Sequence, residues 1–133
     1  MDWFVPAFIR MSLIWFVSGI TLGMGMVLYP PLAVYRTAHF HLNLLGFVVH
    51  MIYGVALHVI PRFFGQPLVH RRFAEVQFWS AQAGLVLLVA GFALRVPAWW
   101  GAEPVLWVGA LLSALAAYLF VANIWATMNA SPL

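Results

Sequence analysis

The chain lacks cysteine and lysine, and it has few charged residues of any kind. Without cysteine it forms no disulfide, and no thiolate is available to bind zinc or an iron–sulfur cluster. Only 7% of its 133 residues are charged, whereas a soluble globular domain carries about 25%. Disordered chains are poor in aromatic residues, and this one is 17% aromatic. Composition therefore excludes both a free soluble domain and a disordered chain.

Long uncharged runs take the place of the missing charge. Four runs of 19 to 30 residues have no charged side chain: residues 11–35, 37–61, 76–94 and 104–133. A membrane-spanning helix needs about 20 predominantly apolar residues, and these runs lack the alternation of a transmembrane β-strand. We predict an all-α membrane protein whose residues 1–133 form a single domain, an antiparallel four-helix arc or bundle. The four transmembrane helices are expected near residues 4–29, 37–60, 75–95 and 104–127.

Prolines and arginines predict where the helices end and how they are oriented. Pro30-Pro31 are expected to end the first helix and Pro61 the second, because proline has no backbone N–H to continue the hydrogen bonding. The first apolar run is longer than that of a signal peptide and no small-residue cleavage site follows it, so we expect it to be retained.

All six basic residues are arginines, and their distribution predicts the topology. Four of them fall on the side of both termini (Arg10, Arg62, Arg71 and Arg72) and two on the other (Arg36 and Arg95). By the positive-inside rule, both termini are expected in the cytoplasm, with the protein in the inner (plasma) membrane of a bacterium. Because the arginines are dispersed among apolar runs, they do not indicate a nucleic-acid partner.

Small residues at helical spacing predict where helices pack closely. Gly19 and Gly23 share one face of the first helix, and Gly84 and Gly91 lie on the third. The fourth helix has Gly109, Ser113 and Ala117, which are four residues apart like Gly19 and Gly23. Small-xxx-small pairs let helix backbones approach in membranes, so we interpret these positions as packing seams.

Histidines are concentrated on the second predicted helix. Four of the five lie there (His39, His41, His50 and His58), and the fifth, His70, follows in the next loop. Ionisable side chains at membrane depth are costly and mark candidate functional sites. At about 100° per residue, His39 and His50 are expected within about 20° of one another, and His41 on roughly the opposite face. Gly46 and Gly54 flank His50 and leave a groove that a flat group or another helix could enter.

This histidine pattern favours a haem over a chelated zinc ion. Zinc needs three or four converging ligands, which opposite faces of one helix do not supply, whereas a haem takes one protein ligand on either side of its plane. His39 and His41 are the candidate iron ligands, with His50, His58, Gly46 and Gly54 as further candidate cofactor contacts. Arg36, one turn before His39, either pairs with a haem propionate or anchors the helix at the interface.

One segment resembles a known family. Ala38-His39-Phe40-His41, then His58 and Pro61-Arg62-Phe63-Phe64-Gly65, are similar to the haem-carrying helix of the haem-copper oxidase and nitric oxide reductase catalytic subunits. Glu75-Val76-Gln77-Phe78-Trp79 resembles the start of the next helix in that family. The resemblance covers roughly residues 36–79. It implies that the two histidines of His-x-His bind haems on opposite faces of one helix, and that the chain corresponds to one of three four-helix arcs.

The chain departs from that family in two respects. It has no adjacent histidine pair to hold copper, and its other three predicted helices contain no histidine. We therefore expect haem b without copper, and no reduction of oxygen or nitric oxide by this chain alone. Two axial imidazoles face each other across the iron, so a bis-histidine haem needs the second helix of another copy or subunit. The alternatives are an open coordination position or a weaker ligand such as Met24 or Met26.

Three functions stay open at the level of sequence. The first is a homo-oligomeric haem protein, a dimer or a trimer, for electron transfer with a quinone or cytochrome or for binding of oxygen or nitric oxide. The second is a cofactor-free accessory or assembly subunit of a respiratory complex. The third is a proton-conducting module that uses the polar stripe His39, Asn43, His50 and Tyr53.

Overall fold

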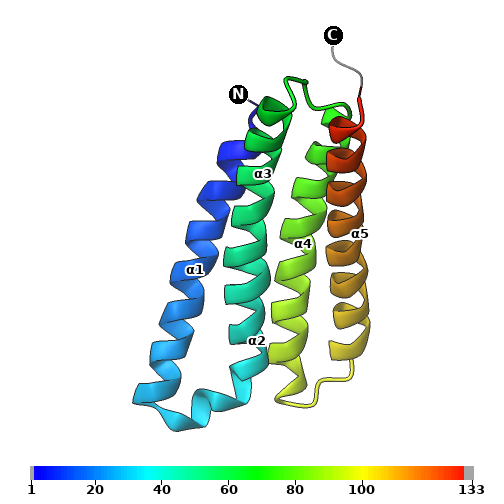
Figure 1. Ribbon diagram of the computed structural model, residues 1–133. Coiled ribbons are helices and arrows are strands. Elements are labelled where there is room, and N and C mark those ends of the chain that lie inside the picture. The colour runs from blue at the N-terminus through cyan, green and yellow to red at the C-terminus, as the bar shows by residue number, and fades with distance from the viewer. Residues whose placement is uncertain (1, 131–133) are drawn as a thin grey trace.

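Helix α1, Phe4–Leu28, crosses the length of the molecule and ends immediately before the Pro30-Pro31 pair. The structure is a computed structural model that describes residues 2–130 (Figure 1). The two prolines open the short 3₁₀ helix η1, Pro30–Tyr35, where a missing N–H costs nothing because the first residues of a helix have no carbonyl to bond. The predicted end of the first helix is thus confirmed to within a residue.

The second span is one continuous helical stretch made of three parts. It consists of α2 (Arg36–His41), the π-helix η2 (Leu42–Val49) and α3 (His50–Phe63). The prediction that Pro61 ends this helix is wrong, since Pro61 lies inside α3 and the helix continues to Phe63. Proline removes one hydrogen bond near the end of the helix, and membrane helices tolerate this where neighbouring side chains bond the freed groups. Pro61 withholds a donor from the Leu57 carbonyl, four residues earlier, while the Arg62 guanidinium donates to the neighbouring His58 carbonyl at 2.9 Å.

The π-helix changes which residues of the second span share a face. In a π-helix each N–H bonds the carbonyl five residues earlier, so every turn is wider than an α-turn. The backbone N–H of His50 accordingly donates to the Leu45 carbonyl. A uniform rotation of 100° per residue between His39 and His50 is therefore wrong for this chain, and the contacts of each histidine must be taken from the structure itself.

Helices α4 (Arg71–Arg95) and α5 (Ala102–Met128) complete four spans that are long and apolar enough to cross a membrane. Both begin a few residues before their predicted starts. Figure 1 shows two antiparallel hairpins, α1 with the second span and α4 with α5, packed side by side. The beginning of α1, loop 64–70 and the end of α5 lie at one end of the bundle. The described residues contain no strand, so the all-α membrane fold with four spans is confirmed.

Glycines form the predicted seams. A side chain on Gly84 would meet the backbone nitrogen of Ser113 at 2.7 Å, and one on Gly109 would meet that of Leu88 at 2.7 Å. Helices α4 and α5 are therefore in backbone contact. Gly19 works differently, because the space beside it is filled by the Asn43 side chain of the second span.

Aromatic and aliphatic side chains form the core in the half of the bundle nearer the termini. Phe8 of α1 meets Tyr53 of α3 and Phe78 of α4 edge to face, with ring centroids 5.5 and 5.0 Å apart. Ala116 and Ile124 bring α5 into the same cluster. This core joins all four spans around the position of His50, whose ring also lies edge to face with Phe8 at 5.6 Å.

Candidate functional site: the histidines of the second span

The histidines of the second span point toward different neighbours. His39 lies against α1, His41 against α4, and His50 lies in the interior. His58 lies near the end of α3, at the end of the bundle where both chain termini lie. In a neutral imidazole the proton is on either Nδ1 or Nε2, and the hydrogen-bond partner of Nδ1 indicates which tautomer is present. The partners of each ring therefore decide which histidines can act as ligands.

His39 packs into the seam with α1. Its Nδ1 lies 2.9 Å from the Gly19 carbonyl oxygen, and its ring fills the space beside Gly23. A carbonyl oxygen only accepts hydrogen bonds, so Nδ1 carries the proton and Nε2 has a free lone pair. The Asn43 amide lies 3.3 Å from the same Nδ1 but donates at 2.9 Å to the His39 carbonyl. The Gly19 carbonyl thus holds the His39 ring in place, and in the neutral ring the lone pair lies on Nε2.

His41 has the same tautomer on the other side of the span. Its Nδ1 lies 2.9 Å from the Thr37 carbonyl oxygen one turn earlier, which again leaves Nε2 with the free lone pair. The ring lies over Phe92 of α4, with centroids 4.6 Å apart. Like His39, it is half-buried, and its Nε2 is not among the buried polar atoms that lack a partner within the described residues. The opposed directions of these two histidines agree with the sequence prediction.

His50 is enclosed by the bundle. The residue is 2% exposed, and its Nδ1 donates at 2.6 Å to the Leu45 carbonyl in the π-helix. Its Nε2 is buried and has no hydrogen-bond partner among the described residues. The cavity beside the ring measures about 20 Å³, room for a water molecule rather than a macrocycle.

His58 has the opposite tautomer. The Arg62 guanidinium, which can only donate, bonds His58 Nδ1, so the proton of the neutral ring lies on Nε2. An Nε2 that carries a proton offers no lone pair to a metal. Among the four histidines of the second span, only His39 and His41 combine an Nε2 lone pair in the neutral ring with a half-buried side chain, and the His39 ring packs against Gly23 of α1.

The predicted glycine groove beside His50 is occupied by a helix. A side chain on Gly46 would meet Trp15 of α1 at 2.7 Å, and one on Gly54 would meet Ile9 of α1 at 2.9 Å. Of the two occupants considered from sequence, a flat group or another helix, the second is observed. Arg36 begins α2, is exposed and makes no side-chain hydrogen bond or ion pair within residues 2–130, so both of its predicted roles stay open.

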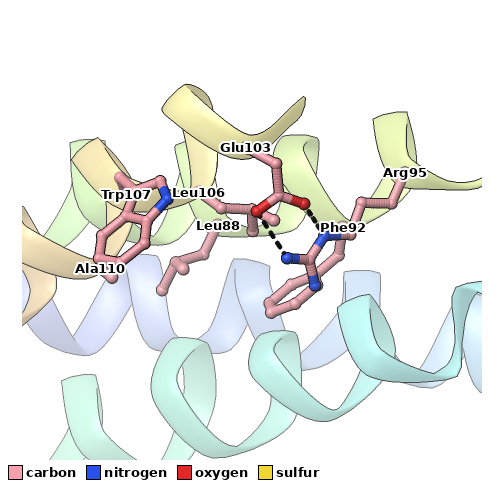
Figure 2. A pocket seen from close by; sticks show the side chains of 7 residues that line it. All are labelled: Leu88, Phe92, Arg95, Glu103, Leu106, Trp107 and Ala110. Carbon is pink, nitrogen blue, oxygen red and sulfur yellow. Dashed lines mark hydrogen bonds and ion pairs between the residues drawn. The ribbon is translucent and has the colours of Figure 1, made fainter. Parts of the chain in front are cut away.

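An apolar groove lies on the α4–α5 hairpin near His41. Figure 2 shows its lining, with the Arg95 guanidinium and the Glu103 carboxylate joined by two hydrogen bonds of 2.8 and 2.9 Å above Phe92. The groove measures about 250 Å³ and is lined by Leu88, Phe92, Arg95, Glu103, Leu106, Trp107 and Ala110. Phe92 contacts His41 and also lines the groove, so one side chain connects His41 to this apolar surface, although His41 itself does not line it.

Sequence reasoning missed several polar residues that line the interior. Trp15 Nε1 donates to Gln82 Oε1 at 3.0 Å, which joins α1 to α4. Both amide atoms of Gln77 and the Gln82 nitrogen are buried and have no partner among the described residues. A glutamine within an apolar span is costly unless it is bonded, so Gln77 and Gln82 could have been identified from the sequence by the same argument as the histidines.

The donor set fits a haem better than a chelated ion. Within residues 2–130, no three histidine, aspartate or glutamate side chains lie together so that they could hold a metal ion. A haem needs only one imidazole with a free nitrogen on each side, and metal-binding histidines commonly donate their other N–H to a backbone carbonyl. His39 and His41 meet both requirements. Comparison of this chain with protein-family models, with curated proteins and with solved structures gives no match in any of the three.

Proposed function

We propose that this protein binds haem b in the membrane through His39 or His41 and serves in electron transfer or in binding a diatomic gas. The observation that carries the proposal is the shared state of these two imidazoles. Each Nδ1 lies 2.9 Å from a backbone carbonyl oxygen, so in the neutral ring Nε2 keeps a lone pair, and neither Nε2 is among the buried, unpartnered polar atoms of residues 2–130. A bound haem supplies one-electron chemistry and a coordination position for a small gas.

The chain's own residues contribute holding and orientation. The carbonyls of Gly19 and Thr37 fix the two imidazoles, so little rotational freedom is lost when either one binds iron. The groove beside Phe92 offers an apolar surface to a ring system near His41. Arg36 has no ion-pair partner within the described residues, so its guanidinium is available to pair with a haem propionate at the membrane surface.

The proposal includes a second copy of the chain. His39 faces α1 and His41 faces α4, so the two do not meet across one iron. A groove of about 250 Å³ is also smaller than the roughly 300–1,000 Å³ of sites that enclose a drug-sized ligand. A bis-imidazole haem would therefore use a histidine of a neighbouring copy, whose apolar helices would cover the rest of the ring.

The test is haem content measured variant by variant. The chain is expressed with ample haem and purified in lipid nanodiscs, and haem per chain is determined from the pyridine haemochrome spectrum. We expect the wild type to show a Soret band and at least one of His39→Ala and His41→Ala to lose it. His70→Ala in loop 64–70 is the matched control and should retain haem.

Three results would contradict the proposal. A wild type without a Soret band would favour a cofactor-free accessory subunit. Loss of haem confined to His58→Ala or His70→Ala would show that the iron is held elsewhere. A haem-loaded monomer with a bis-imidazole spectrum would exclude the shared site.

Carbon monoxide separates the two roles. The reduced protein should show no spectral change with carbon monoxide if both axial positions hold imidazole, which is the electron-transfer arrangement. A spectral change would indicate an open axial position and therefore gas binding. A haem that is held by a single histidine would have such an open position.

A further inference from the structure

A small cavity lies where the second span meets the α4–α5 hairpin. It measures about 20 Å³ and is lined by Leu45, Val49, His50, Tyr53, Ala81, Ser113 and Ala116. A cavity needs about 10–15 Å³ to hold a water molecule, and the water needs two to four polar partners. The cavity is therefore large enough for one water molecule. Whether water occupies it depends on how many polar groups of the lining can bond to that molecule.

His50 presents an unused acceptor at the cavity. Its Nδ1–H donates to the Leu45 carbonyl, so Nε2 of the neutral ring keeps a lone pair. That atom is buried and unpartnered among the described residues, in a residue that is only 2% exposed. More than nine in ten buried polar groups of native proteins are hydrogen-bonded to protein or to ordered water. A donor is thus required beside Nε2, and no side chain of residues 2–130 provides one.

Ser113 of α5 offers the complementary group. Hydroxyl groups within helices usually bond the carbonyl of the preceding turn, as Ser18 and Thr21 do at 2.9 and 2.8 Å. Ser113 lines the cavity but makes no such bond within the described residues. Its hydroxyl oxygen lies beside Gly84 of α4 and has no hydrogen-bond partner in that part of the chain, so it is available to donate to a water in the cavity. The third polar lining residue, Tyr53, also has a hydroxyl without a bond in that part of the chain.

We infer that this cavity binds one water molecule, which donates a hydrogen bond to His50 Nε2 and accepts one from the Ser113 hydroxyl. The water joins the second span to α5 at the level of the aromatic core, where the two elements have no direct polar contact between side chains. The site is separate from His39 and His41, and it does not depend on haem.

Solid-state NMR of the ¹⁵N-labelled protein in lipid bilayers tests the inference. The His50 signals are identified by their absence in His50→Phe. In the wild type we expect a protonated Nδ1, an unprotonated Nε2 and strong magnetisation transfer from water to the ring. Ser113→Ala removes one partner of the water and should reduce that transfer severalfold, while leaving the tautomer unchanged.

Ser80→Ala is the matched control, because Ser80 is a buried serine of α4 that does not line the cavity. Its transfer to His50 should equal that of the wild type. A wild-type His50 ring with no transfer from water, or with its proton on Nε2, would overturn the site. Full transfer in Ser113→Ala would overturn the bridge to α5.

Discussion

At the scale of single residues, polar side chains in the apolar spans have identifiable partners at the end of the bundle that carries the termini. Asn123 is fully buried in α5, and its amide bonds both backbone groups of His70, accepting from the N–H at 3.1 Å and donating to the carbonyl at 3.0 Å. Thr127 accepts a hydrogen bond from the Val69 N–H at 3.3 Å. These contacts fasten loop 64–70 to α5, so the polar residues of this helix serve the fold.

Replacing Asn123 tests that role. Asn123→Ala leaves the His70 N–H without its partner, whereas the His70 carbonyl still accepts from the Phe73 N–H at 3.0 Å. A buried group left unpaired costs about 1–3 kcal/mol. We expect the free energy of unfolding to fall by at least that amount, measured by denaturant titration in detergent. Asn129→Ala is the matched control, because Asn129 is exposed and makes one bond, to the Trp125 carbonyl at 2.8 Å. A control that loses as much as Asn123→Ala would contradict the assignment.

Candidate histidines could be predicted from their membrane depth, but their individual states could not. The sequence places His39, His41, His50 and His58 on one span, and the structure agrees. Their tautomers depend on the Gly19 carbonyl of another helix and on the rotamer of Arg62. Both depend on tertiary contacts and side-chain conformations, which hydropathy and residue spacing do not predict.

At the scale of helices, the number and type of elements followed from hydropathy, whereas their local geometry did not. Uncharged runs of about 20 residues predict spans directly. The π-helix Leu42–Val49 has no comparable signal, because its wider turn depends on packing around Leu45 and His50. Pro61 shows the same limit, since a proline two residues before the end of a helix removes only one backbone hydrogen bond and does not end the helix there.

Contact between α4 and α5 gives a prediction at this scale. A methyl group on Gly84 would approach the Ser113 backbone nitrogen to 2.7 Å and the Gly109 carbonyl oxygen to 3.1 Å. Backbone atoms cannot move aside as a flexible side chain does, so Gly84→Ala must separate the helices. Overpacking of this kind costs about 1–3 kcal/mol, which a lowered melting temperature in nanodiscs would report.

Gly25→Ala is the comparison for that variant. A methyl group there would meet only the end of the Leu32 side chain, at 3.2 Å, which can turn away. Alanine also favours a helix over glycine by about 1 kcal/mol, so this variant should melt at or above the wild-type temperature. Equal losses for both variants would show that the α4–α5 seam is not tightly packed.

At the scale of the whole molecule, the distribution of arginines relative to the ends of the bundle predicts the orientation in the membrane. The end that carries loop 64–70 also carries Arg62, Arg71 and Arg72, and two exposed carboxylates, Asp2 and Glu75, pair with Arg71. At the other end, Arg95 is paired with Glu103. The positive-inside rule counts basic residues and gives acidic ones little weight, so these pairs do not change the expectation of cytoplasmic termini.

The absence of cysteine makes this orientation directly testable. The chain has no native thiol, so a single introduced cysteine can be labelled specifically. Trp100→Cys places a thiol in loop 96–101, where Trp100 is 85% exposed. Val69→Cys places one in loop 64–70, where Val69 is 44% exposed. A membrane-impermeant maleimide added to intact cells should label Trp100→Cys, and it should label Val69→Cys only after lysis. The unmodified chain is the control and should stay unlabelled throughout. Labelling of Val69→Cys in intact cells would place the arginine-rich end outside, because a thiol reacts with this reagent only on the side that the reagent reaches.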